Sequence, residues 1–380
     1  MRFVLNYPEN EGKVKILVLG GTGAIGIDLV NILVKNGHEV FVTSRQKKED
    51  KQSNVQFIQG NAHNLTFLSS ELSKGYDVVV DFMYYSSAEE FARRIDVILE
   101  STNRYVFLSS SRVYADSVLP LTEEASRLLD VCSDENYLKT DEYALVKARQ
   151  ENILFAHQKR NWTIIRPYIT YNNNRLQLGI FEKEEWLYRA LARKKIVFPQ
   201  EMANRKTTLT YGYDVAKMID KIIVNPDTLG EVYHITQPEC ITWGEVLELY
   251  LNILEKKRGF RPVVVDKVNI SKMGSLLGRM AQIKYDRLYD RVFDGTKLEE
   301  MVEEPERYTS TKEGLQSCFE HFLDYEEQYL KMSPKSEAIL DRFASERTPL
   351  NRINGWKNRI RYFIYRNLPI CLIKLCERIM

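Results

Sequence analysis

The sequence has few cysteines and histidines for its 380 residues. Its five cysteines form no C-x-x-C pair, and its five histidines show no spacing typical of metal ligands. We therefore expect neither a disulfide framework nor a zinc or other metal site. Reduced thiols favour a cytoplasmic protein. No apolar run is as long as a membrane-spanning helix, which needs about 18 residues. Residues 1–15 lack the apolar core of a signal peptide.

The chain also lacks a marked excess of charge. Its formal net charge is +2, with 28% charged and 44% hydrophobic residues. Such a balance gives no whole-chain attraction to nucleic acid. It is ordinary globular composition, sufficient for one large domain or two moderate ones.

Short β-branched runs alternate with helical patterns through the first half of the sequence. The pattern predicts strands at 14–19, 39–43, 55–58, 78–82, 105–108 and 162–166, and helices at 24–36, 65–72, 88–100 and 141–158. This alternation indicates an α/β fold with a doubly wound parallel sheet of the Rossmann type.

The rhythm loosens after Pro167, where loops rich in Asn and Gly are followed by helical patterns at 182–193 and 245–256. We expect three parts: a dinucleotide-binding domain, a smaller substrate lobe interleaved with the last strands of the sheet, and a basic amphipathic tail. Their ranges are 1–167, 168–345 and 346–380.

A glycine-rich loop follows the first predicted strand. In "GGTGAIG", the glycines Gly20, Gly23 and Gly26 are spaced G-x-x-G-x-x-G. Glycine allows a tight turn and a close approach of the backbone to a pyrophosphate, which the N–H groups of the next helix then face. The alternative is a tight turn without a ligand. The predicted cofactor contacts here are Gly20, Thr22, Gly23, Ala24, Ile25 and Gly26.

The second predicted strand ends in Ser44 and Arg45, where NAD-binding proteins carry a carboxylate for the ribose hydroxyls. A hydroxyl beside a guanidinium suits a 2′-phosphate. The sequence therefore favours NADP(H), with NAD(H) as the alternative. Another interpretation is that Arg45, Lys47 and Lys48 form a solvated loop.

Two serines and a Tyr-Lys pair form a candidate catalytic group. Ser110 and Ser111 follow the fifth predicted strand, and Tyr143 and Lys147 are four residues apart in a predicted helix. Residues at that spacing share one face of a helix. A phenol can exchange a proton while hydride moves to or from a nicotinamide, and a nearby lysine lowers the pKa of the phenol. The alternative is an ordinary surface pair.

The order of "GGTGAIG", "SSSRVYA", "YALVK" and "IIRPYITY" resembles the extended short-chain dehydrogenase/reductase family, within it the nucleotide-sugar epimerase/dehydratase group. The resemblance covers roughly residues 13–255. It implies that Tyr143 is the general acid/base, Lys147 its ribose-binding partner, and Ser110 the catalytic serine, with Ser111 as second choice. It also implies a homodimer and a nucleotide-sugar substrate. The expected reaction is epimerisation through a keto intermediate, with an NADPH-dependent keto-sugar reductase as the alternative.

Three departures from that family pattern bear on the reaction. Ser111 and Arg112 stand where sugar 4,6-dehydratases have an Asp-Glu pair, so dehydration is disfavoured. Asn61 replaces the acidic residue on the adenine side, although its carbonyl oxygen can still accept a hydrogen bond. "DFMYYSS", from Asp81, alters the floor of the nicotinamide pocket. A third hypothesis is therefore a non-catalytic dinucleotide- or RNA-binding member.

Substrate phosphates require cations. Arg205 and Arg175 lie in loop-like stretches and are candidate substrate contacts, and Tyr168 is a candidate to flank the sugar or to pack between lobes. Three further cations fall on a predicted helix, either as contacts or as its solvated face: Lys183, Arg189 and Arg193.

The tail has eight Lys/Arg against two Glu from residue 346 onward. Apolar residues recur as a stripe along a basic helix, at Trp356, Ile360, Phe363, Ile364 and Leu368. Pro369 should break that helix. The tail fits packing on this chain or a second copy, peripheral contact with an anionic membrane, or, least favoured, nucleic acid.

Overall fold

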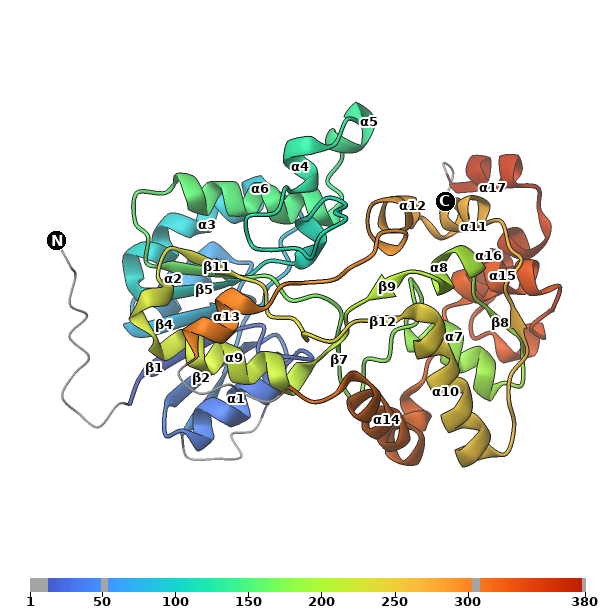
Figure 1. Cartoon of the computed structure of the whole chain (residues 1–380), viewed down its shortest axis with the longest axis horizontal. Coiled ribbons are helices and arrows are strands. Elements are labelled where there is room, and N and C mark those ends of the chain that lie inside the picture. Colours follow the sequence, from blue (N-terminus) through green and yellow to red (C-terminus); the bar gives the residue numbers. More distant parts are fainter. Residues whose placement is uncertain (1–12, 49–53, 303–307, 378–380) are drawn as a thin grey trace.

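A seven-stranded parallel sheet occupies one end of the molecule (Figure 1). The computed structural model describes residues 13–48, 54–302 and 308–377, so the first residues of the predicted first domain and residues 378–380 of the tail lie outside it. The strand order is β11-β6-β5-β4-β1-β2-β3. The strands are β1 (Lys15–Leu19), β2 (Glu39–Ser44), β3 (Val55–Gln59), β4 (Tyr76–Asp81), β5 (Thr102–Leu108), β6 (Trp162–Ile165) and β11 (Glu231–Tyr233). The predicted fold class is confirmed.

Helices cover both faces of this sheet, as the apolar strands require. α1 (Gly26–Lys35) and α9 (Gly212–Val224) pack on one face. α2 (Leu65–Leu72), α3 (Ala88–Ser101) and α6 (Tyr143–Ala156) lie on the other, as Figure 1 shows. The chain order of the strands reverses between β1 and β4, and in open α/β sheets ligands bind at such a switch point.

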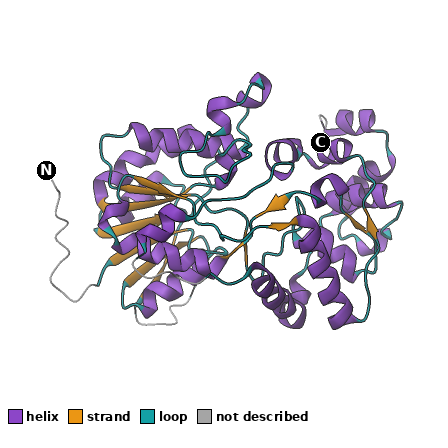
Figure 2. Cartoon of the chain, viewed as in Figure 1, coloured by secondary structure: helices purple, strands orange, loops and turns teal. Residues whose placement is uncertain are grey.

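The other end of the molecule is mainly helical, with paired strands of two residues each (Figure 2). Trp186 stacks on Tyr250 in its core, with ring centroids 4.6 Å apart. The strands are β7 (Thr170–Tyr171), β8 (Ile196–Val197), β9 (Lys206–Thr207), β10 (Thr210–Tyr211), β12 (Ile241–Thr242) and β13 (Val264–Val265). The helices are α7 (Lys183–Leu191), α8 (Gln200–Ala203), α10 (Trp243–Arg258), α11 (Ile270–Leu277), α12 (Met280–Gln282) and α14 (Thr311–His321).

The chain crosses between the two ends more than once. β11 and α13 (Thr296–Met301) belong to the sheet end although they follow helical-lobe segments. Two short helices, α4 (Leu128–Val131) and α5 (Glu135–Leu138), connect β5 with α6. The sheet end is therefore not one continuous stretch of sequence.

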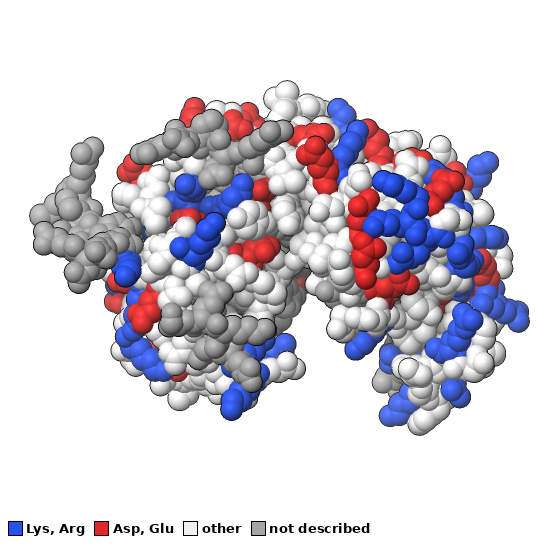
Figure 3. All heavy atoms as spheres, turned by 90° about the horizontal axis from the view of Figure 1, so that it is seen from below, with Lys and Arg blue, Asp and Glu red and all other residues white. Residues whose placement is uncertain are grey.

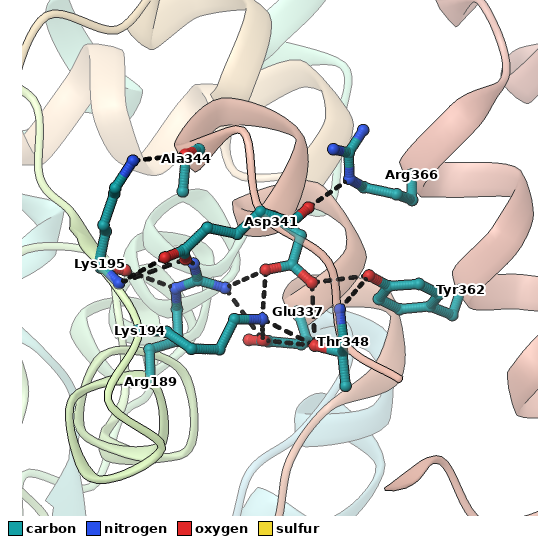
Figure 4. Close-up of polar contacts among 10 residues, drawn as sticks. Arg189, Lys194, Lys195, Glu337, Asp341, Ala344, Thr348, Tyr362 and Arg366 are labelled. Carbon is teal, nitrogen blue, oxygen red and sulfur yellow. Dashed lines mark hydrogen bonds and ion pairs between the residues drawn. The ribbon is translucent and has the colours of Figure 1, made fainter. Parts of the chain in front are cut away.

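Arg189 corrects one sequence interpretation. It was a candidate for the solvated face of α7 or for a phosphate contact, but its side chain is 0% exposed. It forms ion pairs of 3.0, 2.9 and 2.6 Å with Glu337, Asp341 and Glu346, which lie on or just after α15 (Pro334–Ala344) (Figure 4). Helical periodicity predicted an exposed Arg189. A local pattern carries no information about α15, which covers Arg189 and lies more than a hundred residues further along the chain.

The tail forms α16 (Trp356–Asn367) and α17 (Ile370–Glu377), separated at Pro369 as predicted. α16 packs on α15, and Tyr362 donates a 2.6 Å hydrogen bond to Asp341 (Figure 4). The predicted apolar stripe is divided, because Ile364 and Leu368 pack on the chain itself whereas its other three members stay exposed. None of the helices in the described part of the chain combines the length and apolar character needed to span a bilayer.

Candidate functional site

The glycine loop has the geometry that a bound pyrophosphate needs. Gly20 adopts φ +73°, a conformation that favours glycine, and a Cβ on Gly26 would lie 2.6 Å from the backbone of Gly21. By contrast, a Cβ on Gly23 would meet nothing closer than 3.8 Å, so its backbone borders open space. The loop leads into the N-terminus of α1, where N–H groups point outward.

A cavity of about 460 Å³ adjoins this loop. It brings together six of the predicted cofactor residues at the carboxyl ends of β1, β2 and β3: Gly20, Thr22, Gly23, Ser44, Arg45 and Asn61. Ser44 is buried and its hydroxyl accepts a hydrogen bond from the Gln46 N–H, while Arg45 is exposed. His63 lines the same cavity and was not identified from the sequence. Its Nδ1 lies 2.7 Å from the Glu90 carboxylate.

A second cavity, of about 340 Å³, is lined by two of the four predicted catalytic residues. Ser110 and Tyr143 line it together with Tyr168 and Arg175, and Ile25 of the glycine loop forms part of its wall. The loop therefore lies between the two cavities, with Gly23 on one side and Ile25 on the other. Ala24 joins the lobes, because its carbonyl accepts a 3.1 Å hydrogen bond from the Asn172 side chain.

Tyr143 is the first residue of α6, and the cap of that helix fixes its place. The Glu142 carboxylate accepts a 2.8 Å hydrogen bond from the Ala144 N–H, which is a side-chain cap of the helix. The Ser110 hydroxyl lies within hydrogen-bonding reach of Tyr143. Burial raises the pKa of Tyr143, while the guanidinium of Arg112 and the Ser110 hydrogen bond oppose that rise.

Lys147 lies one turn further along α6 and is almost fully buried. Its Nζ donates a 2.7 Å hydrogen bond to the Leu108 carbonyl at the end of β5. Burial lowers the pKa of Lys147 to about 8, although the carboxylates of Asp81 and Glu151 favour its charged form.

The three consecutive serines point in different directions. Ser109 donates a 2.6 Å hydrogen bond to Glu151, and Ser111 donates one of 2.6 Å to the Arg166 carbonyl. Of the two predicted serines, Ser110 pairs with Tyr143 and lines the cavity with it, whereas Ser111 does not line it. The structure therefore brings Ser110, Tyr143 and Lys147 together and turns Ser111 away.

Arg112 also belongs to this site. From the sequence it was noted only because it replaces one of the acidic residues of the dehydratases. Its guanidinium lies 5.2 Å from the centre of the Tyr143 ring. It pairs with Glu142 at 2.6 Å and with Asp286 at 3.3 Å, so it ties the end of β5 to the start of α6 and to the helical lobe. The signal in the sequence was a charged residue directly after the strand-end serines.

A π-helical turn, Ile283–Arg287, supplies the helical-lobe side of this cluster. Such turns are frequent at functional sites. Burial raises the pKa of Asp286, but the cations Arg287, Arg291 and Arg112 outweigh this and hold it below its usual value. Arg287 lines the cavity and donates a 3.2 Å hydrogen bond to Tyr168, whose hydroxyl donates to Asp286.

The two predicted phosphate contacts lie in different places. Arg175 lines the Tyr143 cavity and is loosely held, 3.6 Å from Glu182 with 41% of its side chain exposed. Arg205 lines another cavity, of about 470 Å³, beside Lys206 and Pro120. Only Arg175 is therefore brought to the catalytic group.

Asp81, the last residue of β4 and the first of the altered segment, points into the core. It accepts hydrogen bonds of 2.7 and 2.8 Å from the hydroxyls of Tyr85 and Tyr105, and burial raises its pKa. Tyr84, three residues on, stacks beside Tyr143 with ring centroids 6.2 Å apart. Within the described ranges, no three His, Cys, Asp or Glu side chains gather closely enough to hold a metal ion.

A glycine loop at the switch point of a parallel sheet, with a tyrosine and a lysine one helical turn apart beside it, defines the class of extended short-chain dehydrogenases/reductases. The chain belongs to the NAD dependent epimerase/dehydratase family, whose model matches residues 16–236.

Several known proteins are similar to this chain over part of its length. It is 27% identical over 257 residues to the chloroplast stem-loop binding protein of 41 kDa b from Arabidopsis thaliana, a match that spans 62% of each chain. The solved structure of UDP-glucuronic acid 4-epimerase from Bacillus cereus, with UDP-glucuronic acid and NAD, superposes with a TM-score of 0.61 at 17% identity, covering 82% of this chain and 99% of that one. An epimerase from Methanothermobacter thermautotrophicus gives 0.63 at 16% identity, with 83% and 94% covered. At such identities the structures establish the fold alone.

Proposed function

We propose that the chain modifies a nucleotide-linked sugar by hydride transfer with a bound nicotinamide dinucleotide, most simply as an epimerase acting through a keto intermediate. One observation carries the proposal: Ser110 and Tyr143 line a cavity beside the glycine loop, and Lys147 is bonded to the carbonyl of Leu108 in the wall of that cavity. A reductase acting on a keto-sugar is the alternative within the same chemistry.

The residues present suit the dinucleotide. The open backbone at Gly23 and the start of α1 would hold the pyrophosphate, with Asn61 on the adenine side and Lys147 at the nicotinamide ribose. When bound, the nicotinamide supplies the hydride acceptor. The Bacillus cereus structure of the same fold is a complex with NAD. In this chain Ser44 and Arg45 favour NADP(H), and we propose NADP(H) as its cofactor.

The protein's own groups would handle the proton. Tyr143 takes the proton of the sugar hydroxyl as hydride leaves the same carbon, and returns it when hydride comes back to the opposite face. Tyr143 takes that proton as a phenolate, which the neighbouring cation of Arg112 stabilises before the transfer. Ser110 orients the reacting oxygen.

Three arginines border the cavity, and these fit an anionic substrate: Arg112, Arg175 and Arg287. A nucleoside diphosphate carries the matching charge. Arg112 occupies the position at which a dehydratase protonates its leaving hydroxyl, and a guanidinium cannot do so. Elimination of water is therefore disfavoured.

The test is direct conversion. The purified chain would be incubated with UDP-, GDP- and dTDP-linked sugars, with and without added NADPH, and the products identified by NMR. Epimer formation without net cofactor use supports the first reading, and stoichiometric NADPH consumption supports the reductase. No turnover of any nucleotide sugar would contradict both.

Cofactor choice has its own test. Changing Arg45→Glu should weaken NADP(H) binding by about ten- to a hundredfold, because a charge-assisted bond to the 2′-phosphate is lost. Lys48→Glu is the matched control, since Lys48 lies against Phe57 and does not line the cavity. Equal NADP(H) affinity in wild type and Arg45→Glu would refute the role of Arg45.

The similarity to the Arabidopsis stem-loop binding protein supports a second candidate, a binding protein for structured RNA. It predicts that the chain shifts a stem-loop RNA in a gel and that Tyr143→Phe leaves this binding unchanged. RNA binding together with inert nucleotide sugars would favour this candidate over the enzyme.

A further inference from the structure

One face of α16 is apolar and exposed. Trp356, Ile360 and Phe363 are 67%, 49% and 55% exposed, and their spacing places them on one side of the helix. Tyr362 and Tyr365, on the opposite side, are each 3% exposed and pack on the protein. A helix that only covers its own protein is polar on the outside, so this outward face requires another explanation.

The face belongs to a well-anchored helix. The Thr348 N–H donates a 2.7 Å hydrogen bond to the Tyr362 hydroxyl, which donates to Asp341 (Figure 4). Arg342 of α15 donates a 3.2 Å hydrogen bond to the Arg366 carbonyl near the end of α16. Because the buried side is fixed to α15, the apolar side is held outward as a formed surface.

The charge around this face has one sign. Residues 347–376 contain seven Lys or Arg and no Asp or Glu. Lys357, Arg359 and Arg361 are exposed on α16. At about 100° per residue, Arg359 and Lys357 fall on opposite flanks of the apolar face, and Arg361 lies beyond Lys357 toward the buried side. In Figure 3 the end of the molecule that carries the tail helices in Figure 1 displays both blue and red side chains, so the excess of cations belongs to the tail segment and not to that whole end.

We propose that this face of α16 binds an anionic lipid surface. The apolar side chains Trp356, Ile360 and Phe363 enter the boundary between headgroups and acyl chains, and the flanking cations contact the lipid phosphates. A second copy of the chain would bring like charges together. A nucleic acid would offer nothing that buries Ile360. The surface therefore has the composition of a helix that lies in a membrane interface.

Vesicle flotation of the full chain tests this. Wild type should float with vesicles that contain phosphatidylglycerol and stay at the bottom with phosphatidylcholine alone. The variant Trp356→Ser/Ile360→Ser/Phe363→Ser should lose at least tenfold in bound fraction, with an unchanged unfolding temperature because these side chains are exposed. Val263→Ser/Tyr329→Ser, which removes side chains 63% and 62% exposed elsewhere, should bind as wild type does.

The charge variant Lys357→Gln/Arg361→Gln separates the two contributions. Each lost cation should weaken binding to anionic vesicles about fivefold, and added salt should weaken wild type similarly. The proposal is overturned if wild type does not float with anionic vesicles or if the apolar variant floats equally well. It is also overturned if wild type does not bind vesicles but self-associates or binds RNA, and the apolar variant loses that self-association or RNA binding. Conversion of nucleotide sugars is measured separately, because α16 lines neither the glycine-loop cavity nor the Tyr143 cavity.

Discussion

Two buried ionic clusters, built from the same residue types, differ in what surrounds them. Around Arg189, carboxylates of Glu337, Asp341 and Glu346 enclose a guanidinium that is 0% exposed. Around Arg112, the carboxylates of Glu142 and Asp286 leave the guanidinium beside Tyr143 and an open cavity. In the first cluster the guanidinium is fully enclosed by its carboxylate partners, and the cluster fixes the tail to the helical lobe. The second has a phenol and a lysine whose pKa values are shifted by burial.

This difference separates a stabilising network from a site. Ion pairs alone do not indicate function, because both clusters contain them. The cavity and the shifted proton-exchanging groups distinguish the second cluster, and mutations should have opposite signatures in the two places.

The largest expected effect is on catalysis. Tyr143→Phe removes the proton-exchanging hydroxyl and should lower turnover by about 10²- to 10⁴-fold, with little change in the free energy of unfolding. Tyr84→Phe is the control, since it keeps the neighbouring ring and removes a hydroxyl from a side chain that is 55% exposed. Turnover is compared at saturating substrate, and an active Tyr143→Phe enzyme would remove Tyr143 from the mechanism.

The next effect is on stability at the other cluster. Arg189→Met leaves Glu337 and Asp341 buried with less compensation and should lower the free energy of unfolding by about 3 to 5 kcal/mol. Denaturant titration measures this, and dinucleotide binding should persist. The exposed Arg193 of the same region is the matched control, and equal behaviour of Arg193→Met and Arg189→Met would contradict the structural role of Arg189.

Lys147 should show the reverse signature. Lys147→Met should abolish turnover yet be more stable than wild type at pH 7 by roughly 1 to 3 kcal/mol, because the buried charge is lost. Burial lowers the pKa of Lys147 from 10.5 to about 8, so between these values the unfolded chain binds the extra proton and wild-type stability rises with pH. The difference in free energy of unfolding between Lys147→Met and wild type, measured by denaturant titration, should therefore decrease from pH 8 to pH 10.5. A gap that widens would contradict the assignment.

The smallest effect concerns the pH profile. The cation of Arg112 opposes the rise in the pKa of Tyr143, so Arg112→Gln should raise that pKa further. The acid limb of kcat/KM for hydroxyl oxidation, which needs the deprotonated phenol, should then move to higher pH. Arg112→Lys keeps a cation and should move it less. An unmoved limb in Arg112→Gln would leave Arg112 with a purely structural role.

Much of the sheet end was predictable from the sequence. The β-branched runs at 14–19 and 39–43 became β1 and β2 with shifts of a residue, because a strand buried on both faces has little else it can do. In the helical lobe, the helices predicted at 182–193 and 245–256 are present as α7 and α10. Its paired strands were not predicted, because strands of two residues, such as β8 and β13, are too short to show a period.

The site divides in the same way. Gly20, Tyr143 and Lys147 stand in local motifs, so the sequence identifies them as candidates. The structure places Gly20 and Tyr143 in the walls of two cavities, with Lys147 buried one turn further along α6. Arg112 was missed as a partner of Tyr143, because its position depends on Asp286, which is distant in the chain and reaches the cavity on a π-helical turn.

The most direct test of this account is mass spectrometry of the folded chain in non-denaturing solution with NAD(H) or NADP(H) supplied. The account predicts one dinucleotide per chain in wild type and in Tyr143→Phe, and loss of binding in Gly23→Val, whose side chain would extend into the open space beside the loop. Failure of wild type to bind either dinucleotide, or equal binding by Gly23→Val, would contradict it.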